Sequence, residues 1–249
     1  MAAEHFDADV LIVGAGPVGL ALATELTMRG HTVHVGEKND RTGVQPRAKT
    51  TNIRTMTHMR RWGLVPEMRQ RSSLSADFPR DVIFRRGLFD EPIYTFHDAF
   101  CASPKRYDAF PEHAEFIPQY VVEGVLADHV AAEPLADLVF STELVGFEQD
   151  AAGVTARVRD TGSGDETRIR ARFLVGADGG RSFVRESLGI AMNGKRDLVF
   201  SSTLILRIPG LKDDPDLIRA LFHWIIDEEA ASILGPMDRG DLWYWGKTG

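Results

Sequence analysis

The sequence predicts an α/β fold that leads into a mainly antiparallel β region. An apolar run at residues 10–13 is followed by the glycine-rich turn "GAGPVG", apolar residues at helical spacing and a second strand, "HTVHV", which together indicate a βαβ unit. The stretches "LVFSTELVGFEQD" and "VTARVRD" flank a turn at residues 151–153 and predict a β-hairpin. Beyond residue 197, "LVFSSTLILRIPG" alternates apolar and polar residues, as a half-buried strand does.

Two amphipathic helices and several short strands complete the expected elements. "TTNIRTMTHMRRWGL" predicts a helix that begins at Thr50 or Thr51 and ends at Gly63. "PQYVVEGVLADHVAAEP" predicts a second helix with its valines and a leucine facing inward. "TRIRARFLVGAD" returns the chain to the first sheet, and "IYTF", "LFHWIID" and "DLWYWG" are further short strands.

The composition excludes several classes of protein. A net charge of -7 disfavours binding to nucleic acid or to an anionic membrane. The apolar run over residues 10–26 is interrupted by three glycines and a proline and follows acidic residues, so it predicts neither a signal peptide nor a membrane span. The single cysteine, Cys101, cannot form an internal disulfide and is expected to fill the core of a cytoplasmic protein.

The turn "GAGPVG" has the spacing of a dinucleotide-binding loop. Gly14 permits the tight turn, Gly16 lets the backbone approach a pyrophosphate, and Gly19 lets the helix pack closely on the strand. The phosphates lie in such loops at the positive end of the helix dipole. Glu37, at the end of the second strand, is placed to accept hydrogen bonds from ribose hydroxyls and disfavours a 2′-phosphate. This Rossmann-like unit suits FAD or NAD rather than NADP; a glycine turn without a ligand is the alternative.

A second glycine-rich turn, "GADGGRSFVR", favours one of these cofactors. We expect a buried strand at residues 173–175 that ends at this turn and leads into a helix containing Val184 and Leu188. Asp178 then lies at the carboxyl end of its strand, where ligands of open α/β sheets bind, and Gly179 allows close backbone approach. A simple NAD dehydrogenase has no evident need for a second such turn, so the pair of turns favours FAD.

Three motifs occur in order along the chain: "GAGPVG" with Glu37, "QPRAKTTNIRTM" and "GADGGRSFVR". Together they resemble the FAD-dependent aromatic hydroxylases, the single-component flavoprotein monooxygenases of the para-hydroxybenzoate hydroxylase type. The resemblance covers residues 9–63, the helix from Gln119 and residues 173–189, and is greatest to the branch that acts on phenols and aromatic polyketides. It implies reduction of FAD by NAD(P)H, reaction with O2 and transfer of one oxygen atom to an aromatic small molecule.

The resemblance also implies roles for particular residues. Arg47 would contact the flavin nucleotide, Gln119 would reach the cofactor from the start of its helix, and the backbone near Val145 would lie by the adenine. Asp178 and Gly179 would touch FAD and help to receive NAD(P)H. The full cofactor-binding set is Gly14, Gly16, Pro17, Gly19, Glu37, Lys38, Arg47, Gln119, Val145, Asp178 and Gly179. No catalytic residue or metal ligand is assigned; His223 either faces the substrate or lies on the outer face of its strand.

The resemblance divides the chain into four segments. Residues 1–75 form the FAD-binding βαβ unit with its following helices, and residues 118–190 complete that domain. Residues 76–117 are an excursion toward a substrate domain, of which residues 191–249 form a β-rich part. The family's third flavin motif, Gly-Asp followed by Ala-Ala-His and a proline, does not occur, and the Gly-Asp pair at 240–241 leads into aromatic strand residues instead.

We therefore expect the amino-terminal portion of a longer enzyme, completed by a carboxy-terminal remainder or a second chain. Two alternatives stay open. One is a noncatalytic, truncated or partner-dependent FAD-binding module; the other is a different FAD or NAD oxidoreductase that shares the first βαβ unit.

Overall fold

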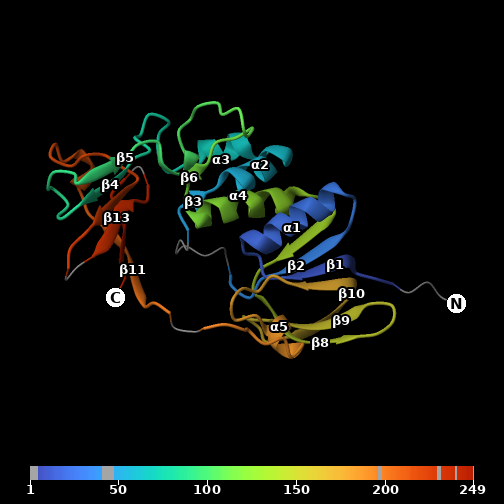
Figure 1. Cartoon of the computed structure of the whole chain (residues 1–249). Coiled ribbons are helices and arrows are strands. Elements are labelled where there is room, and N and C mark those ends of the chain that lie inside the picture. The colour runs from blue at the N-terminus through green and yellow to red at the C-terminus, as the bar shows by residue number, and fades with distance from the viewer. Residues whose placement is uncertain (1–4, 41–47, 196–197, 229–230, 239, 249) are drawn as a thin grey trace. The chain divides into compact units, whose positions relative to one another are not determined.

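The computed structural model describes residues 5–40, 48–195, 198–228, 231–238 and 240–248. The chain forms two compact units (Figure 1): unit 1 comprises residues 1–44 and 122–193, and unit 2 comprises residues 45–121 and 194–249. The fold class agrees with the prediction, because unit 1 carries parallel strands with a hairpin and unit 2 carries a mainly antiparallel sheet.

Unit 1 is built on one six-stranded sheet in the order β7-β2-β1-β10-β9-β8. The strands are β1 (Ala8–Val13), β2 (Val33–Gly36), β7 (Ala136–Val139), β8 (Thr142–Gln149), β9 (Val154–Asp160) and β10 (Glu166–Gly176). β7, β2, β1 and the second half of β10 run parallel, whereas the first half of β10 pairs antiparallel with β9. β10 therefore joins the parallel strands to the β8–β9 hairpin.

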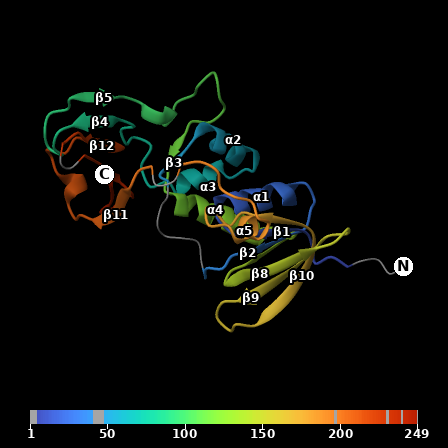
Figure 2. The ribbon, with the colours of Figure 1, turned by 60° about the horizontal axis from the view of Figure 1, so that its bottom comes forward.

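Three helices contribute to the described part of unit 1. α1 (Pro17–Met28) lies on the side of β1 and β2 away from the β8–β9 hairpin (Figures 1 and 2). It ends before Gly30, whose φ of +84° is typical of the residue that stops a helix. α4 (Gln119–Ala132) belongs to unit 1 from residue 122 onward and buries the apolar face that its sequence predicts. α5 (Phe183–Ser187) is a short helix after β10.

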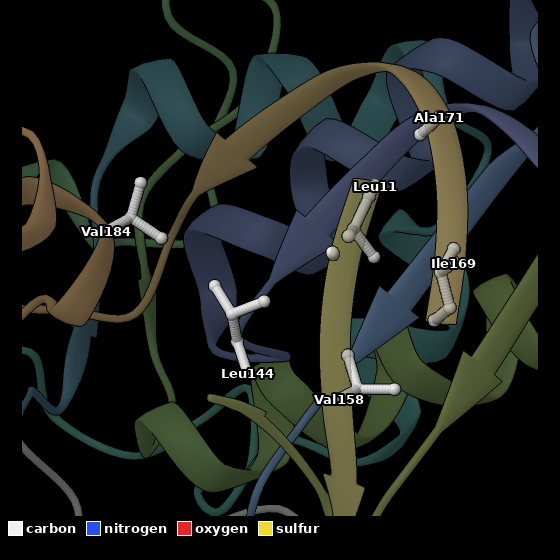
Figure 3. Close-up of a cluster of buried hydrophobic side chains, with 7 residues drawn as sticks. Leu11, Leu144, Val158, Ile169, Ala171 and Val184 are labelled. Atoms are coloured by element: carbon white, nitrogen blue, oxygen red, sulfur yellow. The ribbon is translucent and has the colours of Figure 1, made fainter. Parts of the chain in front are cut away.

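A buried core lies between β1 and the hairpin (Figure 3). It takes residues from β1, β8, β9, β10 and α5, namely Leu11, Leu144, Ala156, Val158, Ile169, Ala171 and Val184. Since α1 covers the other side of β1, this strand is buried on both faces. That position explains why its sequence is a continuous apolar run rather than an alternating one.

Unit 2 contains a second six-stranded sheet in the order β11-β14-β13-β12-β4-β5. The strands are β4 (Val82–Arg85), β5 (Tyr94–Phe96), β11 (Ser201–Arg207), β12 (Phe222–Ile225), β13 (Ser232–Pro236) and β14 (Leu242–Thr248). All neighbours are antiparallel except β12 and β4. A two-stranded sheet of β3 (Thr50–Thr51) and β6 (Glu115–Phe116) accompanies α2 (Ile53–Arg61) and α3 (Val65–Gln70).

The helix predicted from Thr50 or Thr51 begins later. The two threonines form β3, because their branched side chains suit extended backbone and β6 supplies the partner strand. Asn52 caps α2 instead: its side-chain oxygen accepts a hydrogen bond from the Thr55 backbone nitrogen at 3.0 Å. Gly63, with φ of +75°, follows the helix as predicted.

The stretch predicted as one hairpin strand over residues 138–150 is divided in two. β7 ends at Val139 and pairs with β2, and β8 begins at Thr142 after a turn at Ser141, whose φ is +54°. Apolar residues on both sides of the turn made the two strands look like one in the sequence.

Three predictions of burial are wrong. Phe173 is 65% exposed, because it lies beyond Ala171, the last residue of β10 that pairs with β9. β11 forms as predicted but is an edge strand, and its side chains are largely exposed, Leu204 among them. Cys101 is also exposed. The pattern of apolar and polar residues along a strand shows which side chains share a face, but it does not show whether another element covers that face.

Candidate functional site

The carboxyl ends of three parallel strands bring both glycine turns together in unit 1. The backbone nitrogen of Gly14, which follows β1, donates to the Gly36 carbonyl oxygen of β2 at 2.8 Å. The nitrogen of Ala177, which follows β10, donates to the Val13 carbonyl oxygen at 2.8 Å. The two turns are far apart in the sequence. They therefore lie side by side only in the folded chain, at the edge where open α/β sheets bind ligands.

The three glycines of the first turn meet different requirements. A Cβ atom on Gly14 would lie 2.7 Å from the Ala177 carbonyl oxygen, and one on Gly19 would lie 2.0 Å from the Gly14 carbonyl oxygen. Packing of the chain on itself accounts for both. A Cβ on Gly16 would meet no atom within 4 Å. The protein itself therefore does not require a glycine at this position, and the lack of a side chain leaves room for a ligand.

The amino end of α1 is suited to an anion. Gly16 is the residue before the helix, no side chain caps it, and Pro17 occupies the first turn. Backbone N–H groups at such an end carry the positive pole of the helix dipole. No acidic residue lies in the first turn to neutralise it. This arrangement fits a pyrophosphate.

Glu37 links the end of β2 to the first turn. One carboxylate oxygen accepts a hydrogen bond from the Ala15 backbone nitrogen at 2.9 Å, and the other accepts from the backbone and side-chain nitrogens of Asn39 at 3.0 and 2.5 Å. The side chain is half-buried. Carboxylate oxygens have further lone pairs available to ribose hydroxyls. The neighbouring Lys38 is exposed.

Asp178 organises the second turn through its own side chain. One oxygen accepts from the Ser182 hydroxyl at 2.5 Å, and the other accepts from the Val184 backbone nitrogen at 3.2 Å. Ser182 also caps α5 by accepting from the Arg185 nitrogen at 3.0 Å. Gly179, with φ of +80°, has no atom within 4 Å of where a Cβ would lie, so this part of the turn is open to a ligand.

The remaining predicted residues lie in different parts of the chain. Val145 is the extra residue of a β-bulge in β8, and the Thr142 nitrogen places the start of that strand beside Glu37 by donating to its carbonyl oxygen at 2.8 Å. Gln119 begins α4 within unit 2, where its backbone nitrogen donates to the Ala48 carbonyl oxygen at 2.9 Å. Arg47 lies outside the described residues.

Several basic side chains of unit 2 are buried in environments that the sequence does not reveal, among them Lys49 and His223. Lys49 is 6% exposed and is surrounded by aromatic rings, and its burial lowers the pKa of the amine to about 6. His223 is 1% exposed and lines a cavity of about 350 Å³ together with Trp243. Burial, and then the charge of Arg85, lowers the pKa of His223 to about 4. The residues around Lys49 and His223 in the sequence form no pattern that distinguishes a buried side chain from an exposed one.

Two kinds of feature are absent from the described parts of the chain. There, no three His, Cys, Asp or Glu side chains are grouped so that they could hold a metal ion. Within the same residues, no helix combines the length and the apolar character that a membrane span requires.

Two glycine turns at adjoining strand ends, an open helix terminus and a carboxylate on the next strand define a dinucleotide-binding protein. The chain belongs to the FAD binding domain family, whose match covers residues 7–247. FAD is therefore the cofactor for which this fold is built, and the open faces of Gly16 and Gly179 fit a bound nucleotide.

The chain is similar to hydroxylases from polyketide metabolism. It is 37% identical to aklavinone 12-hydroxylase DnrF of Streptomyces peucetius over 251 residues, which is 96% of this chain and 49% of that protein. Solved relatives include substrate-free RebC, the rebeccamycin biosynthetic enzyme, with a TM-score of 0.89 and 28% identity over 98% of this chain and 47% of RebC.

A complex of aklavinone-11 hydroxylase with FAD and aklavinone matches with a TM-score of 0.87 and 29% identity, over 99% of this chain and 46% of the hydroxylase. The chain thus spans about half the length of the relatives it matches.

Proposed function

We propose that this chain is the cofactor-binding part of an FAD-dependent monooxygenase that hydroxylates an aromatic or polyketide-type molecule. The observation that carries the proposal is the junction of the two glycine turns, where Ala177 donates to the Val13 carbonyl oxygen at 2.8 Å. A single dinucleotide loop serves many oxidoreductases, whereas this pair, in a chain 37% identical to a hydroxylase, supports one class.

The proposed roles follow from the contacts in unit 1. The amino end of α1, with Gly16 and Pro17, binds the pyrophosphate. Glu37 accepts hydrogen bonds from the ribose while it holds the first turn through Ala15. Asp178 keeps the second turn in shape, and the backbone of Gly179 approaches the cofactor. Gly14 and Gly19 act indirectly, by allowing strand, turn and helix to pack.

The other members of the predicted set complete the proposal. On the resemblance to this family, we propose that the backbone near Val145 lies by the adenine and that Lys38, Arg47 and Gln119 contact the nucleotide. When bound, FAD would supply the redox chemistry of the reaction, for which NAD(P)H provides the electrons and O2 the oxygen atom that is placed on the aromatic ring. We assign the protein to the cytoplasm, where NAD(P)H is supplied.

Binding of FAD by the 249-residue chain tests the first part of the proposal. Gly16→Val adds a side chain where the protein has space, so this variant should fold but lose FAD affinity by about tenfold or more, because the side chain occupies the ligand's space. Ala152→Val makes a similar addition in the exposed β8–β9 turn and should bind FAD normally. Equal affinity in both variants would rule out the proposed phosphate site.

NAD(P)H oxidation in the presence of trial phenols tests the second part. A chain that binds FAD and consumes NAD(P)H with a phenol, yielding the hydroxylated product by mass spectrometry, supports the monooxygenase. A chain that binds FAD and leaves NAD(P)H and phenols unchanged would instead support the alternative, a noncatalytic FAD-binding module.

A further inference from the structure

Lys49 has an unusual environment in unit 2. Its amine lies 4.1 Å from the ring centroid of Tyr244, 4.2 Å from that of Phe222 and 5.2 Å from that of Phe116. The buried amine has no hydrogen-bond partner in the described part of the chain. A buried lysine normally has a partner, because desolvation of an ammonium group is costly.

The fold makes space for this side chain. The Lys49 carbonyl oxygen accepts a hydrogen bond from the Ile117 nitrogen at 2.8 Å, which holds the backbone beside β6. At Gly235 of β13, a Cβ atom would lie 3.3 Å from the Lys49 amine and 2.3 Å from the Leu221 carbonyl oxygen. The backbone of Lys49 is therefore held by a hydrogen bond, and the lack of a side chain at Gly235 leaves space for its amine.

The protonation state follows from the same surroundings. Burial lowers the pKa of the amine to about 6, so near pH 7 most of it is uncharged and can accept a proton. Of the ionisable groups on the packed strands, Glu115 of β6 is engaged by Arg69 at 2.9 Å, and His223 of β12 points to the face opposite Phe222. Tyr244 contacts the Lys49 amine with the face of its ring. Once protonated, the ammonium group gains from the three aromatic faces.

The aromatic cage continues along one face of the sheet. Trp224 and Phe84 lie on the same face as Phe222 by strand alternation and register, and their ring centroids are 5.2 Å apart. Phe96 and Tyr94 extend this row, and both are more than half exposed. Rings of this kind provide a stacking surface for a planar aromatic ligand.

We propose that Lys49 accepts the proton of an acidic aromatic hydroxyl, so that a phenol-class ligand binds beside Phe222 and Tyr244 as its phenolate. The O–H bond of the ligand breaks, its electron pair stays on oxygen, and the proton forms a new N–H bond on the amine; nothing is oxidised or reduced. This role rests on the proposed function, since a phenolate ring is richer in electrons and accepts an electrophilic oxygen more readily.

The test uses the 249-residue chain and 4-nitrophenol, whose phenolate is yellow and whose acid form is nearly colourless. In the unmodified chain, bound 4-nitrophenol should ionise about one pH unit or more below the free compound. Lys49→Met should abolish this shift and weaken binding about tenfold or more. Lys105→Met, which removes an exposed lysine near Tyr107, should change neither.

Lys49→Arg separates proton acceptance from simple charge. Arginine stays protonated, so the affinity of this variant should rise with pH until the free phenol ionises, whereas the unmodified chain should bind with constant affinity between the pKa of Lys49 and that of the phenol. Identical pH profiles for the two chains would overturn the proposal, as would a failure of the unmodified chain to bind 4-nitrophenol.

Reductive methylation with ¹³C-formaldehyde provides a readout that needs neither phenol nor FAD. The signal lost in Lys49→Met should titrate near pH 6, and titration at the ordinary lysine value would overturn the proposal. The two proposals can fail separately. If the unmodified chain does not bind FAD but shows the Lys49-dependent shift in the ionisation of 4-nitrophenol, only the monooxygenase proposal is rejected. If it binds FAD but does not show that shift, only the role of Lys49 is rejected.

Discussion

At the scale of single residues, Lys49 is maintained at a cost to stability. Its folded pKa of about 6 lies below the value of 10.5 in an unfolded chain. Between these values the unfolded state binds more protons, so the free energy of unfolding should rise with pH across this window. Lys49→Met should remove that dependence and raise the free energy of unfolding at pH 7 by roughly 2–5 kcal/mol. Urea unfolding at a series of pH values measures both effects, and an unchanged slope would contradict this account.

His223 predicts a second pH dependence at lower pH. Its folded pKa of about 4 lies below the ordinary histidine value of 6.5, because the ring is buried and faces the charge of Arg85. As pH falls from 6.5 to 4 the unfolded state takes up the proton first, and stability should decrease by up to about 3 kcal/mol. His223→Gln should flatten this part of the profile, while the exposed His31→Gln should retain it.

At the scale of elements, α5 and the second glycine turn depend on one serine. The Ser182 hydroxyl caps α5 by accepting from Arg185 and donates to Asp178, so Ser182→Ala removes both contacts. We expect a loss of about 1 kcal/mol in the free energy of unfolding and weaker FAD binding, because the Asp178 carboxylate loses a partner. Ser187→Ala, at the exposed end of α5, is the matched control in unfolding and FAD titrations. A similar FAD affinity in both variants would show that the cap is structural only.

The elements also show how far pattern alone extends. β1, α1 and β2 could be predicted because apolar periodicity, a glycine turn and a helix stop agree over adjacent residues. The predicted start of α2 was wrong because Thr50 and Thr51 pair with β6, a strand from a distant part of the chain. β13 was missed, since "SILGP" is too short to show a period.

At the scale of the whole molecule, ligand binding should report on unit 1. FAD at a hundredfold its dissociation constant should raise the free energy of unfolding by about 2.7 kcal/mol if it binds only the folded chain. Hydrogen exchange should slow most at the ends of β1 and β10, where the two turns meet. Gly16→Val should weaken both effects: with a tenfold loss of affinity, the same FAD concentration should stabilise that variant by no more than about 1.4 kcal/mol. Stabilisation of Gly16→Val as large as that of the unmodified chain would place the nucleotide elsewhere.

The path of the chain through the two units bears on the proposed domains. β4 and β5, from the segment at residues 76–117, belong to the same sheet as β11–β14 from residues 191–249. This pairing supports our proposal that the segment is an excursion into a substrate domain. The parallel pairing of β12 with β4 joins residues far apart in sequence, which a single sequence cannot specify.

The sequence by itself determined the first βαβ unit, the glycine turns and the class of cofactor, because those features depend on residues close together along the chain. Tertiary structure alone decided that the two turns touch, that Gly16 faces open space while Gly14 and Gly19 do not, and that Lys49 lies among three rings. Burial and the pKa of a side chain depend on neighbours brought from distant segments, and no local pattern records them.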